Sequence, residues 1–277
     1  MALVTTASLV AAAQAARVGV GAFNVVQLEN VEAILSGATA ADRPVILQVS
    51  QNAVRYHGAL APIARACMAA AEAASCDASI HLDHAEDVDL VREAIDLGFS
   101  SVMYDASTME YAANVDATAA VTQTCHEAGL WVEAELGEVG GKQGVHAPGV
   151  RTDPEEAAAF VAATGVDALA VAVGSSHKMV ERTARLDDDL IARLAVAVQR
   201  PLVLHGSSGV DDDGMRAAIV AGITKVNVAT QLNKVFTAAV RSVLTTSPAE
   251  VDPRRYLGPG RAAMATEAAR LLTVIAG

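Results

Sequence analysis

The sequence predicts an α/β fold in which eight parallel β-strands alternate with α-helices and close into a barrel. Three observations lead to this prediction. The 277 residues suit one large barrel domain, which typically takes about 250 residues. Short apolar runs alternate with longer helical stretches along the chain, and polar residues follow nearly every run. An open doubly wound sheet would share the alternation, but chemistry at so many strand ends favours a barrel spanning residues 1–277 as a single domain.

The predicted strands are rich in Ala, Val, Leu and Ile, which is typical of parallel strands that are covered on both faces. Such strands look continuously hydrophobic instead of alternating between polar and apolar residues. They are Val18–Val25, Val45–Ser50, Ser79–His84, Ser101–Asp105, Leu130–Leu136, Ala168–Gly174, Leu202–His205 and Lys225–Ala229.

Helices are predicted between these strands, and capping residues indicate several of their ends. Asp153 is a predicted N-cap residue, because Pro154 follows it directly and proline is favoured at the first position of a helix. Glycines stand where left-handed C-caps are expected, at Gly98, Gly129, Gly165 and Gly222. The predicted helices include residues 11–16, Leu60–Ala74, Val88–Leu97, Ala112–Ala128, Pro154–Ala163, Asp189–Val198 and Asp213–Ala221, with an extra C-terminal helix from Gly260 to Ile275.

Composition excludes several classes of function. A net charge of −12 leaves no broad basic surface for nucleic acid. No uninterrupted apolar stretch reaches the roughly 20 residues that a membrane span needs. The three cysteines, Cys67, Cys76 and Cys125, form no CxxC pair, and an odd number does not suggest a disulfide framework. We therefore expect a cytoplasmic protein that binds neither nucleic acid nor membranes.

Three histidines stand at the ends of predicted strands, each beside small or acidic residues. They are His84, His177 and His205, in the segments His81–His84, Gly174–His177 and His205–Gly209. In a barrel, these strand ends meet around one cavity. Three neutral imidazoles suit Zn²⁺ and leave one position open for a substrate. The pattern therefore predicts a metal-dependent enzyme.

Two further segments carry polar chemistry. Glu133 and Glu135 share one face of a strand, and two buried carboxylates require a cation or hydrogen-bond donors. The glycine-rich stretch that follows, with Gly140 and Gly141 as hinges, is consistent with a mobile lid. Residues 206–209 open a helix after a strand, an arrangement that directs backbone N–H groups at an anion such as phosphate.

Nine segments, in order, resemble one family along the whole chain. They are Gly21–Val26, Val45–Ser50, His81–His84, Ser101–Ser107, Val132–Gly137, Thr164–Gly174, Pro201–Val210, Lys225–Thr230 and Asp252–Tyr256. The chain resembles the class II, zinc-dependent ketose-bisphosphate aldolases, and most closely the branch that acts on tagatose and fructose bisphosphates. The resemblance implies cleavage of a ketose bisphosphate between C3 and C4 to dihydroxyacetone phosphate and an aldehyde, and the reverse condensation.

The resemblance also implies roles for particular residues. Asp83 would be the acid–base group at the C4 hydroxyl. The zinc ligands would be His84, His177 and His205, with Glu135 able to reach the ion and Asp105 associated with a second cation. The sugar phosphate would contact Asn24, Ser50, Gly206, Ser207, Ser208, Asn227 and Thr230, and Lys178, which departs from the family pattern, would add positive charge to this anion site. Arg254 would reach from a neighbouring subunit toward the aldehyde half of the substrate, which implies a homodimer or homotetramer.

The chain departs from the family pattern near the predicted lid. Lys142 and Gln143 stand where acidic residues are usual. Either His146 or a water held by Gln143 replaces the lid base, or proton exchange on dihydroxyacetone phosphate is slow. Lys178 replaces a glycine, and Val180 a tyrosine. These changes leave open another ketose 1-phosphate with an anionic tail, such as a deoxy-keto-gluconate phosphate or sulfofructose phosphate. A zinc hydrolase and a weakly active sugar-phosphate-binding relative are further alternatives.

Overall fold

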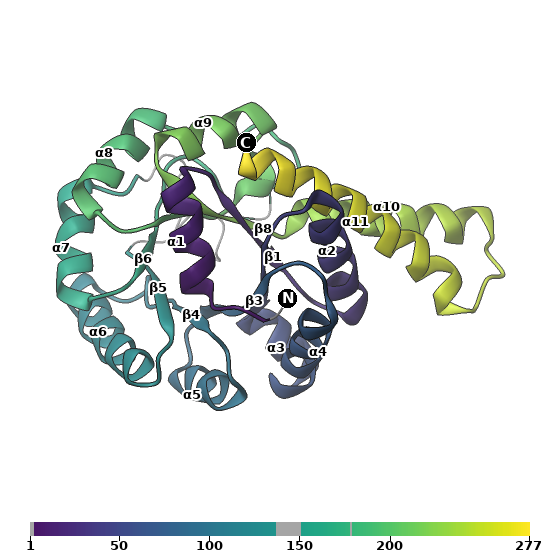
Figure 1. Ribbon diagram of the computed structural model, residues 1–277, viewed down its shortest axis with the longest axis horizontal. Helices are drawn as coiled ribbons and strands as arrows, with labels where there is room; N and C mark the ends of the chain where they lie inside the picture. Colours follow the sequence, from purple (N-terminus) through teal and green to yellow (C-terminus); the bar gives the residue numbers. More distant parts are fainter. Residues whose placement is uncertain (1–2, 137–150, 178) are drawn as a thin grey trace.

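The eight strands close into a parallel barrel, which confirms the predicted fold class. A computed structural model describes residues 3–136, 151–177 and 179–277. Each strand pairs in parallel with its neighbours in sequence, and β8 closes the barrel by pairing with β1 (Figure 1). The strands are β1 (Val20–Asn24), β2 (Val45–Ser50), β3 (Ala78–Ala85), β4 (Ser101–Tyr104), β5 (Trp131–Glu135), β6 (Ala168–Ala170), β7 (Leu202–Leu204) and β8 (Ile223–Val228).

Helices surround the barrel and follow its strands. They are α1 (Thr6–Ala16), α2 (Leu28–Ala41), α3 (Gln51–His57), α4 (Ala61–Ala73), α5 (Val88–Leu97), α6 (Tyr111–Glu127), α7 (Pro154–Thr164), α8 (Asp188–Val198), α9 (Asp212–Ala221), α10 (Thr230–Thr246) and α11 (Pro253–Ala276). A short 3₁₀ turn, η1 (Ser207–Gly209), follows β7. Among the described residues, no helix combines the length and the apolar character that a membrane crossing requires.

Helix α1 covers the amino-terminal end of the barrel. The hydroxyl of Thr6 bonds to Ser79 at 3.0 Å, and it accepts a bond from Ser101 at 2.6 Å. Both serines lie where their strands begin. Leu9 and Val10 of α1 pack on the apolar side chains that fill the barrel interior. Helix α1 thus covers this end of the barrel, opposite the carboxyl ends of the strands.

The structure confirms the predicted caps of several helices and revises others. Asp153 accepts hydrogen bonds from the backbone of the first turn of α7, as expected of an N-cap. Gly98 and Gly165 are left-handed C-caps, and α6 has Ala128 as its C-cap, followed by Gly129 with a positive φ of 79°. Gly222 ends α9 at a φ of 137°, outside the left-handed helical region that was predicted.

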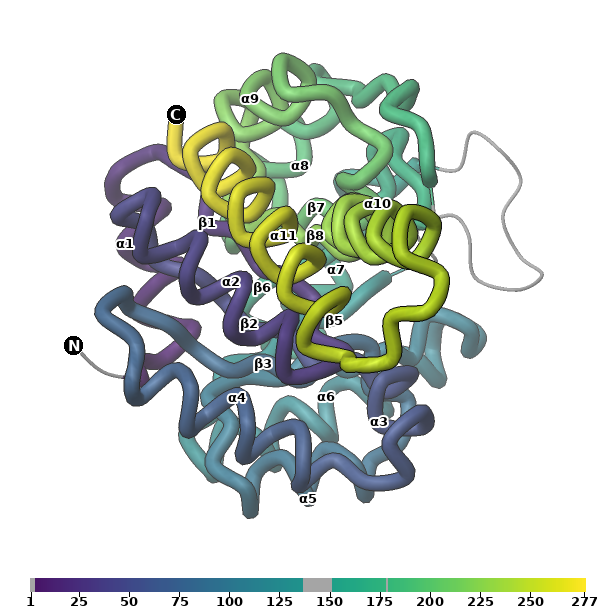
Figure 2. Tube along the Cα trace, turned by 90° about the vertical axis from the view of Figure 1, so that its right-hand side faces the viewer, coloured from purple at the N-terminus to yellow at the C-terminus, as the bar shows by residue number. Residues whose placement is uncertain are grey.

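The largest difference from the sequence prediction concerns the C-terminal helix. It begins at Pro253 instead of Gly260 and continues through Pro259, with Asp252 as its N-cap. Helix α10 precedes it, and the two form an antiparallel hairpin that projects from the barrel (Figures 1 and 2). Contacts with α10 and α2 keep α11 helical across Pro259. Helix propensity depends on the local sequence alone, so it does not reflect these contacts.

We predict that Gly37→Val weakens the attachment of α11 to the barrel. A Cβ atom at Gly37 of α2 would lie 2.6 Å from the backbone oxygen of Ala265 and 2.8 Å from the Cβ of Ala268. Backbone cannot move aside cheaply, so we expect a loss of about 1–3 kcal/mol in the free energy of unfolding. Urea denaturation at fixed metal concentration measures it.

Ser36→Val serves as the matched control, because it introduces the same side chain one residue earlier in α2, at an exposed position. Serine and valine have similar helix propensities, so the control should change the stability by no more than about 0.5 kcal/mol. Equal stability of the two variants would contradict the close packing of α2 against α11.

Candidate active site

A cavity of about 170 Å³ opens at the carboxyl ends of the strands. In barrels of this type, functional residues gather at this end. Polar side chains dominate its lining, and they come from the ends of six strands, β1, β2, β3, β6, β7 and β8, and from the segments that follow them. The lining residues are Asn24, Ser50, Asn52, Asp83, His84, His177, His205, Gly206, Ser208, Asn227, Ala229 and Thr230.

A β-bulge in β3 brings two consecutive side chains to the cavity. In a regular strand, Asp83 and His84 would point to opposite faces. The register with β4 instead shifts between Leu82 and Ala85, so that β3 carries one extra residue. His84 has a φ of 49°, a left-handed conformation that is unfavourable for a residue with a Cβ atom. The bulge therefore places Asp83 and His84 together, at the cost of local strain.

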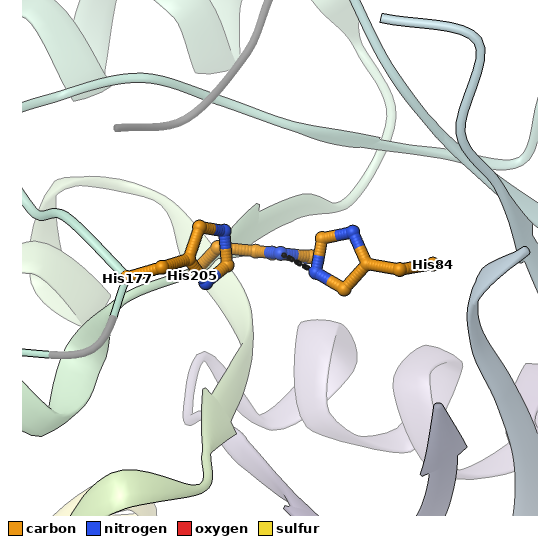
Figure 3. Close-up of side chains that lie close together, drawn as sticks. All are labelled: His84, His177 and His205. Atoms are coloured by element: carbon orange, nitrogen blue, oxygen red, sulfur yellow. Dashed lines mark hydrogen bonds between the residues drawn. The ribbon is translucent and has the colours of Figure 1, made fainter. Parts of the chain in front are cut away.

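Three imidazole rings meet at this point, as Figure 3 shows. The ring centres of His84 lie 5.1 Å from His177 and 4.8 Å from His205, and the remaining pair is 5.5 Å apart. One nitrogen atom from each ring lies within 4.8 Å of the other two. The structure thus brings together the three histidines that the sequence predicted as ligands.

Carboxylates surround His84. Its Nδ1 atom lies 2.7 Å from Asp105 Oδ2, and Asp105 and Glu135 form a second potential metal-binding group with it. Burial alone would lower the pKa of His84, but the charges of Asp83, Asp105 and Glu135 raise this pKa to about 9. The surroundings therefore favour a positive charge at this position, which suits a bound cation.

The hydrogen bonds of this cluster have a fixed polarity, because both ends are carboxylates. Asp105 can only accept, so His84 donates from Nδ1. Glu133 Oε1 lies 2.9 Å from His205 Nε2, so this nitrogen is the donor. The bond of 3.1 Å between His84 Nε2 and His205 Nδ1 then has His205 as its acceptor. The lone pair of His205 Nδ1 faces the other two rings.

Asp83 is held beside this cluster as a carboxylate. Its Oδ2 atom accepts a hydrogen bond of 2.8 Å from Asn24, whose own Oδ1 accepts one of 3.2 Å from Gln48. Burial alone would raise the pKa of Asp83, but the imidazoles of His84 and His205 and the hydrogen bond from Asn24 contribute to a pKa below its ordinary value. The Oδ1 atom accepts no hydrogen bond from any described residue, so it can serve a substrate.

A cradle of small groups lies on the other side of the cavity. Gly206 has a φ of 66°, and a Cβ atom there would lie 2.5 Å from Ser176 O, so only glycine fits. Ser208 lines the cavity, and its Oγ accepts a hydrogen bond of 3.1 Å from the backbone N–H of Gln231. Thr230 is the first residue of α10. Hydroxyls, backbone N–H groups and a helix N-terminus together suit an anion.

Most of the predicted site residues line this cavity, and a few lie elsewhere. Ser207 is buried, and its hydroxyl donates to the backbone oxygen of Asn227. Arg254 lies in the first turn of α11, with 88% of its side chain exposed, and its own chain's cavity does not include it. The predicted lid residues Gly140, Gly141, Lys142, Gln143 and His146, and Lys178, lie outside the described residues.

Sequence reasoning missed two contributions. Asn52, in the first turn of α3, lines the cavity. Lys225 lies fully buried beneath the cluster and donates to Glu133 and Asn227. Lys225 stands two residues before Asn227 in β8, so the two share a face of the strand, and this spacing was a usable signal.

Comparisons with known proteins agree with this geometry. A family model described as class II fructose-bisphosphate aldolase matches residues 4–276. A fructose-bisphosphate aldolase of Thermus caldophilus is 38% identical over 289 residues, covering 95% of this chain and 94% of the relative.

Solved structures show the same fold over nearly the whole chain. The YdjI aldolase from Escherichia coli K12 is 27% identical with a TM-score of 0.87, covering 99% of this chain and 97% of that one. A fructose-bisphosphate aldolase from Campylobacter jejuni is 22% identical with a TM-score of 0.83, covering 99% and 95%. The chain therefore belongs to the class II fructose-bisphosphate aldolases, a family of lyases.

Proposed function

We propose that this protein is a zinc-dependent aldolase that cleaves a ketose 1-phosphate, such as fructose or tagatose 1,6-bisphosphate, to dihydroxyacetone phosphate and an aldehyde. One observation carries the proposal. Three imidazoles, the carboxylate of Asp83 and a cradle suited to phosphate face the same cavity. A metal-dependent retro-aldol cleavage of a sugar phosphate uses these three parts: a cation, an acid–base group and an anchor for the phosphate.

The chain's own residues fit a zinc ion. His84, His177 and His205 would be its ligands, with Glu135 and Asp105 near enough to His84 to assist or to hold a second cation. Three nitrogen donors leave a position for substrate oxygens, as catalytic zinc sites require. When bound, the ion supplies a Lewis acid that stabilises the enediolate charge formed on cleavage. Such an enzyme needs no Schiff-base lysine.

Asp83 would remove the proton from the C4 hydroxyl during cleavage and return it during condensation. Its lowered pKa keeps it ionised at neutral pH, as a base in the cleavage direction must be. Asn24 orients it by holding Oδ2, which leaves Oδ1 for the substrate hydroxyl. Asn24, Ser50 and Asn227, which line the cavity, would contact the hydroxyls and carbonyl of the sugar.

The phosphate of the dihydroxyacetone half would lie in the cradle of Gly206, Ser208 and Thr230. Binding of this phosphate orients the C3–C4 bond toward Asp83 and the histidines. The reacting groups are then held in position before the reaction begins. The other end of the substrate sets specificity. Ketose 1-phosphates with different anionic tails therefore belong in the same assay panel as the two bisphosphates.

We also propose a cytoplasmic homodimer or homotetramer that binds neither nucleic acid nor membranes. The three cysteines are unpaired and buried, as in a reducing compartment. Arg254 would complete the site of a neighbouring subunit, because it lies on the projecting hairpin and away from its own cavity.

Removal of the metal should abolish cleavage, and Zn²⁺ should restore it. His84→Ala should lose bound zinc, because it removes one of three ligands. His126→Ala is the matched control: this imidazole lies on α6, where it contacts Asp167, and its variant should keep both zinc and activity. Metal content by elemental analysis and coupled detection of the triose product measure both effects. Full activity in a metal-free preparation would rule out the mechanism.

Asp83→Asn should keep the metal but lose about 10²-fold or more in kcat/KM, the usual scale for an acid–base group. The amide preserves the shape of the side chain and cannot accept a proton. Asp89→Asn, at an exposed position in the first turn of α5, controls for the loss of one carboxylate. Near-normal turnover of Asp83→Asn would assign the proton transfer to another group, with Glu135 or His146 the next to test.

Arg254→Ala should raise KM for substrates with an anionic aldehyde end far more than for neutral ones. Arg255→Ala removes the same charge one residue further along α11, and it should leave this selectivity unchanged. Light scattering should find at least a dimer in both variants. A monomeric protein whose selectivity does not depend on Arg254 would overturn the proposed role in the neighbouring site.

A further inference from the structure

A buried ion pair lies directly beneath the three histidines, and the proposed reaction makes no use of it. Lys225 Nζ of β8 lies 2.8 Å from Glu133 Oε2 of β5. Both side chains are fully buried. Two charges in a barrel interior are costly to remove from water, and an apolar pair of similar volume is often equally stable. The pair therefore suggests a role in positioning other groups.

Every hydrogen bond of Glu133 constrains a neighbour. As a carboxylate, it can only accept. Its Oε2 atom accepts from Lys225, which directs Oε1 toward His205 Nε2 at 2.9 Å. Glu133 thereby requires the proton of His205 to be on Nε2 and leaves the lone pair of Nδ1 facing His84 and His177. A carboxylate that orients a ligand histidine in this way tunes a metal site from outside it.

Lys225 imposes a second constraint on the same cavity. Its ammonium group has only donors, so the Asn227 atom at 2.8 Å is the amide oxygen. The Nδ2 atom of Asn227 is then directed away from Lys225, 3.0 Å from His205 Nε2. His205 Nε2 already donates to Glu133, so it cannot accept a hydrogen bond from Asn227. The N–H groups of Asn227 are thus available to a substrate oxygen in the cavity that Asn227 lines.

We propose that Lys225 and Glu133 are positioning residues, which together hold His205 with its Nδ1 lone pair toward the zinc site and hold Asn227 with its amide N–H groups toward the substrate. This inference rests on the proposed zinc site. The pair acts through His205 and Asn227 and touches neither the ion nor the sugar.

The test compares Glu133→Gln, Lys225→Met and the double variant. Either single change leaves one buried charge without its partner, so it also destabilises the fold. The double variant removes both charges and nearly preserves side-chain volume, so its melting temperature should return to within a few degrees of the parent. Thr164→Val, which removes a buried hydrogen bond in α7 away from the site, controls for loss of any internal polar contact.

Zinc affinity, measured by competition with a chelator, distinguishes a role of the pair in orienting His205 from a role that only balances buried charge. In the double variant we expect zinc to bind about 10- to 100-fold more weakly than in the parent, despite the recovered stability. Ring ¹⁵N shifts of His205 in the metal-free proteins should report the Nε2–H tautomer in the parent and a mixture in the double variant. An unchanged affinity together with an unchanged tautomer would overturn the role toward His205.

Kinetics at saturating zinc test the role toward Asn227. The amide would donate to an oxygen that gains charge in the transition state, so kcat should fall about tenfold or more while KM changes little. Equal kcat in parent and double variant would overturn this half of the proposal. Absence of zinc binding by the parent itself would instead contradict the proposed function. The two failures are therefore distinguishable.

Discussion

The close approach of three imidazoles among buried carboxylates is the constraint on which the rest of this site depends. Without a cation, nitrogen atoms as close as 3.1 Å must share a proton, and the charges of Asp83, Asp105 and Glu135 raise the pKa of His84 to about 9. The fold supports this arrangement with a bulge and with the positive φ of His84. The bulge and the positive φ are locally unfavourable. Attraction between a bound cation and the surrounding side chains would offset this local cost.

Sequence reasoning predicted the barrel and the histidine cluster because both depend on local patterns. Buried parallel strands are recognisable as apolar runs, and the ends of such strands meet at one edge of a barrel. The sequence alone therefore predicted a cluster of three histidines, His84, His177 and His205. The structure places one nitrogen of each within 4.8 Å of the others. The same reasoning predicted that Glu133 and Glu135 need a cation or hydrogen-bond donors, and both Lys225 and His205 lie within hydrogen-bond distance of Glu133.

Other features depend on contacts between distant segments, which a local pattern does not contain. The β3 bulge arises from register with β4, so strand periodicity alone would place Asp83 and His84 on opposite faces, and their shared site was predicted from the family resemblance of the segment. The passage of α11 through Pro259 depends on packing against α10 and α2. The spacing of Lys225 and Asn227 shows that they share a strand face, but the partner of Lys225 is Glu133 of β5, which the closed barrel brings to 2.8 Å.

The charge of the cavity lining gives a reason for the projecting hairpin. No lysine or arginine is among the described residues that line the cavity, and Lys225 beneath it is neutralised by Glu133. Neutral donors and the N-terminus of α10 can hold one phosphate, with help from a bound cation. A second anionic group, in a protein of net charge −12, needs positive charge from outside this lining. Helix α10 begins at the cradle and extends for 17 residues, about 25 Å, and the proposed role of Arg254 in a neighbouring subunit's cavity would use this reach.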